Sequence, residues 1–141
     1  MDQLLEFASR HLLLVGALAI VILALIANEL WRKFTGMAPI SSAEAIRLMN
    51  SEDAVIVDTR SASDFKKKHI INAKHVPTAG IVDRAKEISK DPDKTIIIYC
   101  GTGHSAQQAA TKLRKHGYSR VLTLKGGIGG WEADGMPVTR K

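Results

Sequence analysis

The longest apolar run in the chain covers residues 12–27 and contains no charged side chain and no polar face. Asn28 and Glu29 interrupt the run, and apolar residues extend it to Trp31. A helix over residues 12–31 is about 30 Å long, which matches the hydrocarbon core of a bilayer. Because a surface helix of a soluble protein carries a polar face, this pattern predicts a transmembrane helix.

This helix divides the chain into four predicted segments. They are a short N-terminal tail (1–11), the transmembrane helix (12–31), a linker (32–39) and a domain (40–141). Trp31 suits an interfacial anchor, and Arg32 and Lys33 follow it, whereas only Arg10 lies on the other side. Because positive charge favours the cytoplasmic side, we expect an inner (plasma) membrane protein with its N-terminus outside and its domain in the cytoplasm.

A cleaved signal peptide is the main alternative to a membrane anchor. Its positively charged leader would have to include Asp2 and Glu6, which suit that role poorly. The residues after the apolar run also offer no convincing pair of small residues for cleavage. The sequence therefore favours the anchor.

The remaining sequence alternates between strand and helix patterns. Strands are predicted at 54–58, 73–76, 95–99 and 121–124, with a strand end at Ile40; helices are predicted at 41–50, 80–89, 105–116 and near Trp131. Ser41 and Glu44 have the spacing of a capping box at the first of these helices. Such alternation predicts an α/β domain with a central, mostly parallel five-stranded sheet and helices on both faces.

The only cysteine, Cys100, follows the strongest strand and opens a glycine-containing loop. Parallel sheets place their sites where strands end, and Asp58 ends another strand at the same edge. Backbone N–H groups of the loop and the N-terminus of the next helix would converge there, favour an anion and lower the pKa of a thiol. A buried structural cysteine is the alternative, since free cysteine packs like a small hydrophobic residue.

The residues after Cys100 suit an anion-binding loop. Gly101 and Gly103 allow positive φ angles that turn N–H groups inward. Thr102 and Ser105 offer hydroxyl donors, and Ser105 also suits a helix N-cap. His104 either contacts the substrate or faces solvent.

Composition narrows the classes of ligand. The net charge of +6 lies entirely beyond residue 35, where an anionic lipid surface or a small anionic substrate is a plausible partner. Scattered basic residues and few aromatic residues argue against nucleic acid. One cysteine excludes an internal disulfide, five histidines show no metal-ligand spacing, and nothing indicates an organic cofactor.

Three motifs in order resemble the rhodanese family, whose fold carries sulfurtransferases. The motifs are Val57-Asp58-Thr59-Arg60 with His69-Ile70 and Val76-Pro77, then Tyr99-Cys100-x-x-Gly103, then Leu124-Lys125-Gly126-Gly127 with Trp131. Lys68 and Asn72 stand where the family usually has glycines. The resemblance covers about residues 38–139.

The resemblance implies that Cys100 accepts a sulfane sulfur and holds it as a persulfide within the loop 101–105. It implies a structural role for Asp58 behind the loop, ion pairing or anion attraction for Arg60, and a place at the pocket rim for Lys125. The neutral loop is similar to that of mercaptopyruvate sulfurtransferases, which leaves thiosulfate and 3-mercaptopyruvate as possible donors. Ser105 stands where phosphate-binding relatives need an arginine, which argues against phosphatase activity.

Two functions remain open from the sequence. The first is a membrane-anchored sulfurtransferase or sulfur carrier that receives sulfur from a small donor on Cys100 and passes it to a thiol, a protein or cyanide. The second is a non-catalytic module that uses the same fold to bind a membrane protein partner. An intact loop cysteine favours the first, and the membrane anchor suits both.

Overall fold

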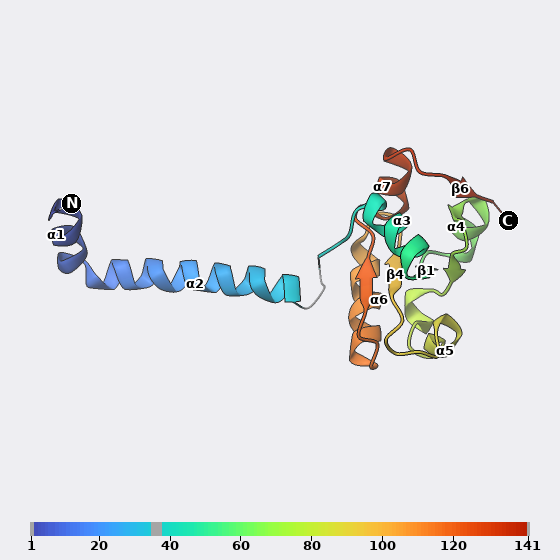
Figure 1. The fold of residues 1–141 in the computed structure, drawn as a ribbon, viewed down its shortest axis with the longest axis horizontal. Helices are drawn as coiled ribbons and strands as arrows, with labels where there is room; N and C mark the ends of the chain where they lie inside the picture. Colours follow the sequence, from blue (N-terminus) through green and yellow to red (C-terminus); the bar gives the residue numbers. More distant parts are fainter. Residues whose placement is uncertain (1, 35–37, 141) are drawn as a thin grey trace. The chain divides into compact units, whose positions relative to one another are not determined.

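The computed structural model describes residues 2–34 and 38–140, so residues 35–37 of the predicted linker lie outside the described residues. The chain forms two compact units, Met1–Thr35 and Gly36–Lys141. The first unit contains helix α1 (Asp2–Arg10), where the sequence predicted a tail, and helix α2 (Leu12–Phe34) (Figure 1).

Helix α2 is long and apolar. Its stretch Leu12–Trp31 has a mean hydropathy of 2.5 and no buried share within the structure, and it is long enough to cross a membrane. Among the described residues it is the one helix that meets this condition. The helix continues beyond Trp31 to Phe34, into the segment predicted as linker. Large apolar side chains exposed on every side of a helix need a partner other than water.

The second unit is built around a parallel sheet of four strands in the order β3-β1-β4-β5. These are β1 (Val55–Asp58), β3 (Lys74–His75), β4 (Ile96–Tyr99) and β5 (Val121–Thr123). The mostly parallel sheet is as predicted, but the expected fifth strand is reduced to one isolated bridge between Ile40 and Leu124. Asp58 pairs with Tyr99, so β1 and β4 end together at one edge.

A second, two-stranded sheet pairs β2 (His69–Ile70) with β6 (Val138–Thr139) in antiparallel orientation. The short helix α4 (Ala62–Lys67) comes directly before β2. The sequence pattern predicted none of these three elements, because each is too short to show a periodicity. The pairing brings the end of the domain back to its middle.

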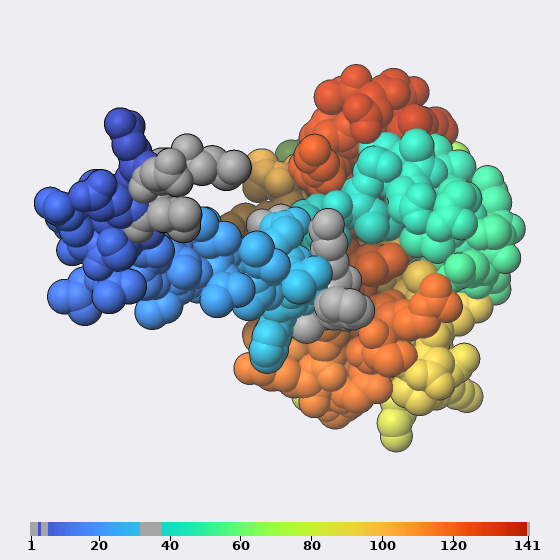
Figure 2. All heavy atoms as spheres, turned by 60° about the vertical axis from the view of Figure 1, so that its left-hand side comes forward, coloured from blue at the N-terminus to red at the C-terminus, as the bar shows by residue number. Residues whose placement is uncertain are grey.

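Helices cover both faces of the parallel sheet, as predicted. One face packs against α6 (His104–Lys115), the 3₁₀ turn η1 (Thr78–Gly80) and α5 (Ala85–Ile88). The other packs against α3 (Ser42–Ser51) and α7 (Gly127–Ala133), which lie side by side in Figure 2.

The single helix predicted over 80–89 is wrong in detail, because the segment forms the end of η1, a turn and the four-residue α5. Ile81, Ala85 and Ile88 are nevertheless all buried in the same cluster. The spacing of these residues therefore predicted their burial correctly. The segment is nevertheless not one regular α-helix, because several of its local hydrogen bonds span three residues rather than four.

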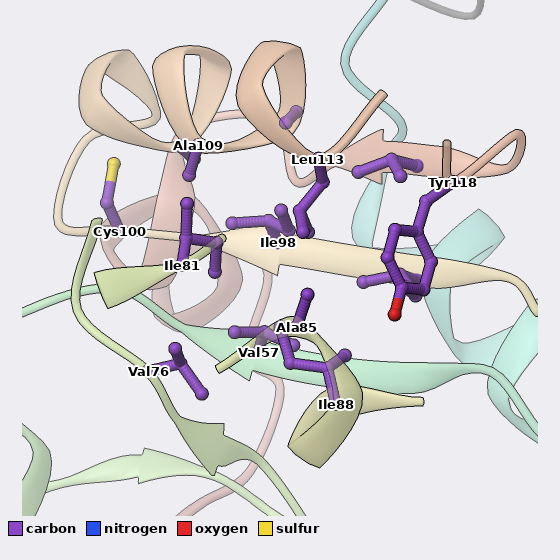
Figure 3. Packing of buried hydrophobic residues seen from close by; sticks show 14 residues of the cluster. Val57, Val76, Ile81, Ala85, Ile88, Ile98, Cys100, Ala109, Leu113 and Tyr118 are labelled. Atoms are coloured by element: carbon purple, nitrogen blue, oxygen red, sulfur yellow. The ribbon is translucent and has the colours of Figure 1, made fainter. Parts of the chain in front are cut away.

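The side chains of β4 alternate between the two hydrophobic clusters. Ile96 and Ile98 belong to the cluster on the α6 face, whereas Ile97 and Tyr99 belong to the cluster on the α3 face. Cys100 continues this alternation and joins the cluster of Ile98. Figure 3 shows its side chain at the end of β4, pointing toward the start of α6.

Candidate active site

Cys100 lies directly after β4, at the edge where β1 and β4 both end. Its residue surface is 3% exposed, so the thiol is screened from bulk water. Burial alone raises the pKa of the Cys100 thiol, because it penalises the thiolate. Any reactivity must come from groups that compensate for this cost.

Hydrogen-bond donors of the loop supply that compensation. The N–H of Gly103 lies 2.9 Å from Cys100 Sγ. The hydroxyl of Ser105 and the N–H groups of Ala106 and Thr102 also donate to the sulfur. Together these donors outweigh the effect of burial and bring the pKa of Cys100 below its usual value. The geometry therefore stabilises a negative charge on this sulfur.

The loop reaches this arrangement through one left-handed glycine. Gly103 has a φ of 100° and forms the N-cap of α6 without a side-chain bond. Gly101 is not among the residues with positive φ, so the prediction that both glycines turn the loop this way is wrong for Gly101. Ser105 is the second residue of α6 rather than its N-cap, which leaves its hydroxyl for the sulfur.

Other predicted site residues lie on the surface around the loop. Thr102 and His104 are exposed, and His104 is the first residue of α6. Lys125 is exposed next to Gly126 and lines a groove of about 400 Å³ together with Ser41 and Asp134.

Helix α7 contacts carbonyl groups at the start of the cysteine loop. The sequence analysis missed this contact. The N–H of Ile128 donates to Cys100 O at 2.9 Å, and the N–H of Gly129 donates to Gly101 O at 3.2 Å. Gly126 and Gly127, with φ of 72° and 60°, precede these donors. The two adjacent glycines ahead of a helix were the available signal for a close backbone contact.

Asp58 and Arg60 form a buried ion pair behind the loop. The Arg60 guanidinium donates to Asp58 Oδ2 at 2.7 Å and to the carbonyl of Lys68 at 2.6 Å. Asp58 is fully buried, and the Arg60 side chain is 10% exposed. The Tyr99 hydroxyl bonds the same carboxylate and accepts the N–H of Ile70 at 3.1 Å. These contacts join β1, β2 and β4 just before the loop begins.

The described residues contain no group of three or more histidine, cysteine or acidic side chains placed to hold a metal ion. Both His69 and His75 place a ring nitrogen 2.8 Å from a backbone carbonyl, that of Phe65 and that of Arg60 respectively. Because a carbonyl only accepts, these nitrogens carry protons and donate. The two rings also stack on Phe65.

Residues 41–134 match the family described as the rhodanese-like domain. The chain belongs to the rhodanese-like domain family. The family resemblance in the sequence is thereby confirmed. The match begins at the N-cap of α3 and ends just after α7, so it includes β4, the cysteine loop and the α7 contact.

Some relatives of this rhodanese-like chain align with nearly all of it, and others align with the domain alone. It is 33% identical over 141 residues to the uncharacterized protein YibN of Escherichia coli K12, with 99% of each chain aligned. It is 39% identical over 92 residues to a sulfurtransferase of Allochromatium vinosum, covering 65% of this chain and 84% of the relative.

Solved structures agree with this assignment. The solution structure of the rhodanese-like domain of the Anabaena protein Alr3790 is 28% identical, with a TM-score of 0.65 over 73% of this chain and 79% of that one. The rhodanese-like fold and a sulfurtransferase type of family are therefore established for this protein.

Proposed function

We propose that the protein is a membrane-anchored sulfurtransferase or sulfur carrier that holds a sulfane sulfur on Cys100 as a persulfide. The single observation that carries the proposal is the set of donors around Cys100 Sγ, which lowers the pKa of the thiol despite its burial. A sulfurtransferase relative that is 39% identical supports the same chemistry.

The proposed reaction has two displacement steps. The Cys100 thiolate attacks the outer sulfur of a donor such as thiosulfate, a new S–S bond forms, and sulfite leaves with the electron pair of the broken bond. A thiolate or cyanide then attacks the outer sulfur of the persulfide. The Cys100 thiolate leaves with its electron pair and is restored, so the cycle needs no further oxidant or reductant.

The same donors serve both steps of the cycle. In the first step, the groups of Thr102, Gly103 and Ser105 that donate to Cys100 Sγ favour the attacking thiolate. The Cys100 thiolate is also the leaving group of the second step, and donors that stabilise it favour its departure.

The sulfur donor is thiosulfate or 3-mercaptopyruvate, and the neutral loop does not distinguish between the two. Residues 101–105 contain no lysine or arginine to hold a sulfonate. His104 and Lys125, both exposed, are the candidates to attract an anionic donor. The exposed surface around the loop suits a thiol or protein acceptor.

We further propose that α2 crosses the inner membrane with the rhodanese-like domain in the cytoplasm. The apolar stretch Leu12–Trp31 supports the crossing, and Arg32 and Lys33 against Arg10 alone support the direction. The acceptor is then a thiol near the bilayer, and a membrane protein is a suitable partner.

The test is sulfur transfer by the full chain in detergent micelles, with thiosulfate or 3-mercaptopyruvate as donor and cyanide as acceptor. We expect turnover that Cys100→Ala and Cys100→Ser both abolish. Lys86→Ala, at an exposed position of α5, is the matched surface control and should retain full turnover. Turnover that survives loss of Cys100 contradicts the proposal.

A further inference from the structure

Helix α7 and the active loop meet backbone to backbone. A Cβ atom added at Gly127 would lie 2.2 Å from Cys100 O and 2.8 Å from both Gly101 C and Gly101 O. These distances are far below van der Waals contact, and the atoms in the way are backbone rather than flexible side chain. The close approach therefore depends on the absence of a side chain at residue 127.

This contact fixes the direction of the loop's peptide groups. Because Ile128 and Gly129 donate to Cys100 O and Gly101 O, both carbonyls point toward α7. In a planar trans peptide the N–H points opposite to the C=O. The peptide that carries Gly101 O also carries the N–H of Thr102, so holding that oxygen on α7 turns the N–H of Thr102 away from α7.

The sulfur lies on the side to which that N–H points. The N–H of Thr102 is one of the groups that donate to Cys100 Sγ, and the N–H of Gly103 follows it in the same loop at 2.9 Å. The chain of contacts therefore runs from the backbone of α7, through the peptide that joins Gly101 and Thr102, to the Thr102 donor at the sulfur.

We propose that Gly127 is a positioning residue for the sulfur chemistry: by letting α7 hold the carbonyls of Cys100 and Gly101, it fixes the start of the loop and orients the N–H of Thr102 onto Sγ. This inference rests on the proposed function and adds to it the element outside the loop on which the reactivity of Cys100 depends. In this role Gly127 acts through the backbone of the loop and not through contact with a substrate.

The test substitutes Gly127→Ala in the full chain and measures how the rate of Cys100 alkylation by iodoacetamide depends on pH. The single cysteine makes intact mass an unambiguous readout. We expect the midpoint of the profile to rise by roughly one pH unit, the order expected for one lost donor to an anion. The rate well below the midpoint then falls about tenfold, because the thiolate fraction falls by that factor.

Gly135→Ala is the matched control. Gly135 has a φ of 73°, close to the 60° of Gly127, but an added Cβ meets no atom within 4 Å. Both variants therefore place alanine in a left-handed conformation, and only Gly127→Ala pushes on the loop. A folded Gly127→Ala protein with the same alkylation midpoint as the Gly135→Ala and unaltered proteins overturns the inference.

A second measurement uses the unaltered chain, so the inference stays testable if Gly127→Ala does not fold. Amide resonances of Ile128 and Gly129 are followed by NMR while Cys100 ionises, with Cys100→Ser as reference. We expect both to shift with the midpoint of the thiol, and the amide of the distant Gly117 to stay still. Fixed resonances at Ile128 and Gly129 overturn the inference.

The outcomes separate this inference from the proposed function. A wild-type chain that gains no sulfur on Cys100 contradicts the proposed function, whatever the glycine variants do. An unaltered midpoint in Gly127→Ala leaves the persulfide chemistry intact and removes only the role of α7.

Discussion

Two opposing effects, burial and hydrogen bonding, act on the pKa of the Cys100 thiol. Burial in the cluster that contains Ile98 raises the pKa of the thiol, and four donors of the loop and α6 lower it by more. The result is a thiol that water reaches only slightly and whose pKa still lies below its usual value, because of these donors. Reactivity at this site is therefore expected to respond to the loss of any single one.

Ser105 is the donor that a side-chain substitution removes most cleanly. Ser105→Ala deletes the hydroxyl but keeps α6, so we predict that the midpoint of Cys100 alkylation moves to higher pH. The sign follows from the hydrogen bond, which favours the charged sulfur and therefore lowers the pKa of Cys100. Ser105→Thr retains a hydroxyl and should restore a midpoint near that of the unaltered protein. Equal midpoints for all three proteins would exclude a role for this hydroxyl.

The buried ion pair of Asp58 and Arg60 makes a prediction about stability. Asp58→Ala removes the carboxylate that two groups of the Arg60 guanidinium contact, at 3.1 Å for Nε and 2.7 Å for the terminal nitrogen. A largely buried guanidinium without its partner costs about 3 kcal/mol of unfolding free energy. Urea denaturation measures this loss, and a change within 0.5 kcal/mol, roughly the range of ordinary surface substitutions, would contradict it.

Sequence reasoning located the thiol and its loop, because a strand, a glycine-containing loop and a helix form a contiguous local pattern around Cys100. It placed the positive φ on Gly101 as well as Gly103. For Ser105 it offered both a donor role and the N-cap role that Gly103 takes. It missed Gly127, since the partner of this residue lies far away in sequence. A contact between two backbones involves no side chain, so the glycine itself is its only sign in the sequence.

At the scale of elements, long and strongly patterned segments were predictable and short ones were not. Strand β4 carries four buried residues in a row and has a clear apolar pattern. Strands β2 and β6 have two residues each, and their pairing joins residues about 70 positions apart, as in His69 with Thr139. No local pattern encodes such a pairing. The prediction of a fifth strand was wrong for a related reason. The pairing there involves a single residue, Ile40, opposite Leu124.

Helix α3 forms one of the two hydrogen bonds of the predicted capping box, the one that Ser41 accepts. Ser41 accepts the N–H of Glu44 at 3.2 Å, but the carboxylate of Glu44 pairs with Arg47. We therefore predict that Ser41→Ala costs about 1 kcal/mol of unfolding free energy. Glu44→Gln should cost much less, because its side chain does not return to the helix N-terminus. Thermal denaturation of both variants tests this, and equal losses would contradict this assignment.

At the scale of the whole molecule, an apolar helix and a rhodanese-like domain share one chain. The proposed orientation predicts that a protease added to inverted inner-membrane vesicles cleaves the domain, which contains 17 of the 20 lysine and arginine residues. Intact right-side-out vesicles should protect it until detergent is added. Cleavage in the right-side-out vesicles alone would reverse the orientation, and release of the uncleaved chain by alkaline carbonate would exclude a membrane span.

The most direct test of the central claim is the intact mass of the full chain after incubation with thiosulfate and, separately, with 3-mercaptopyruvate. We predict that at least one donor adds the mass of one sulfur atom, that cyanide removes it, and that Cys100→Ala never acquires it. The more effective donor then identifies the substrate. A chain that gains no sulfur from either donor, or a Cys100→Ala chain that gains the same mass, would contradict a persulfide on Cys100.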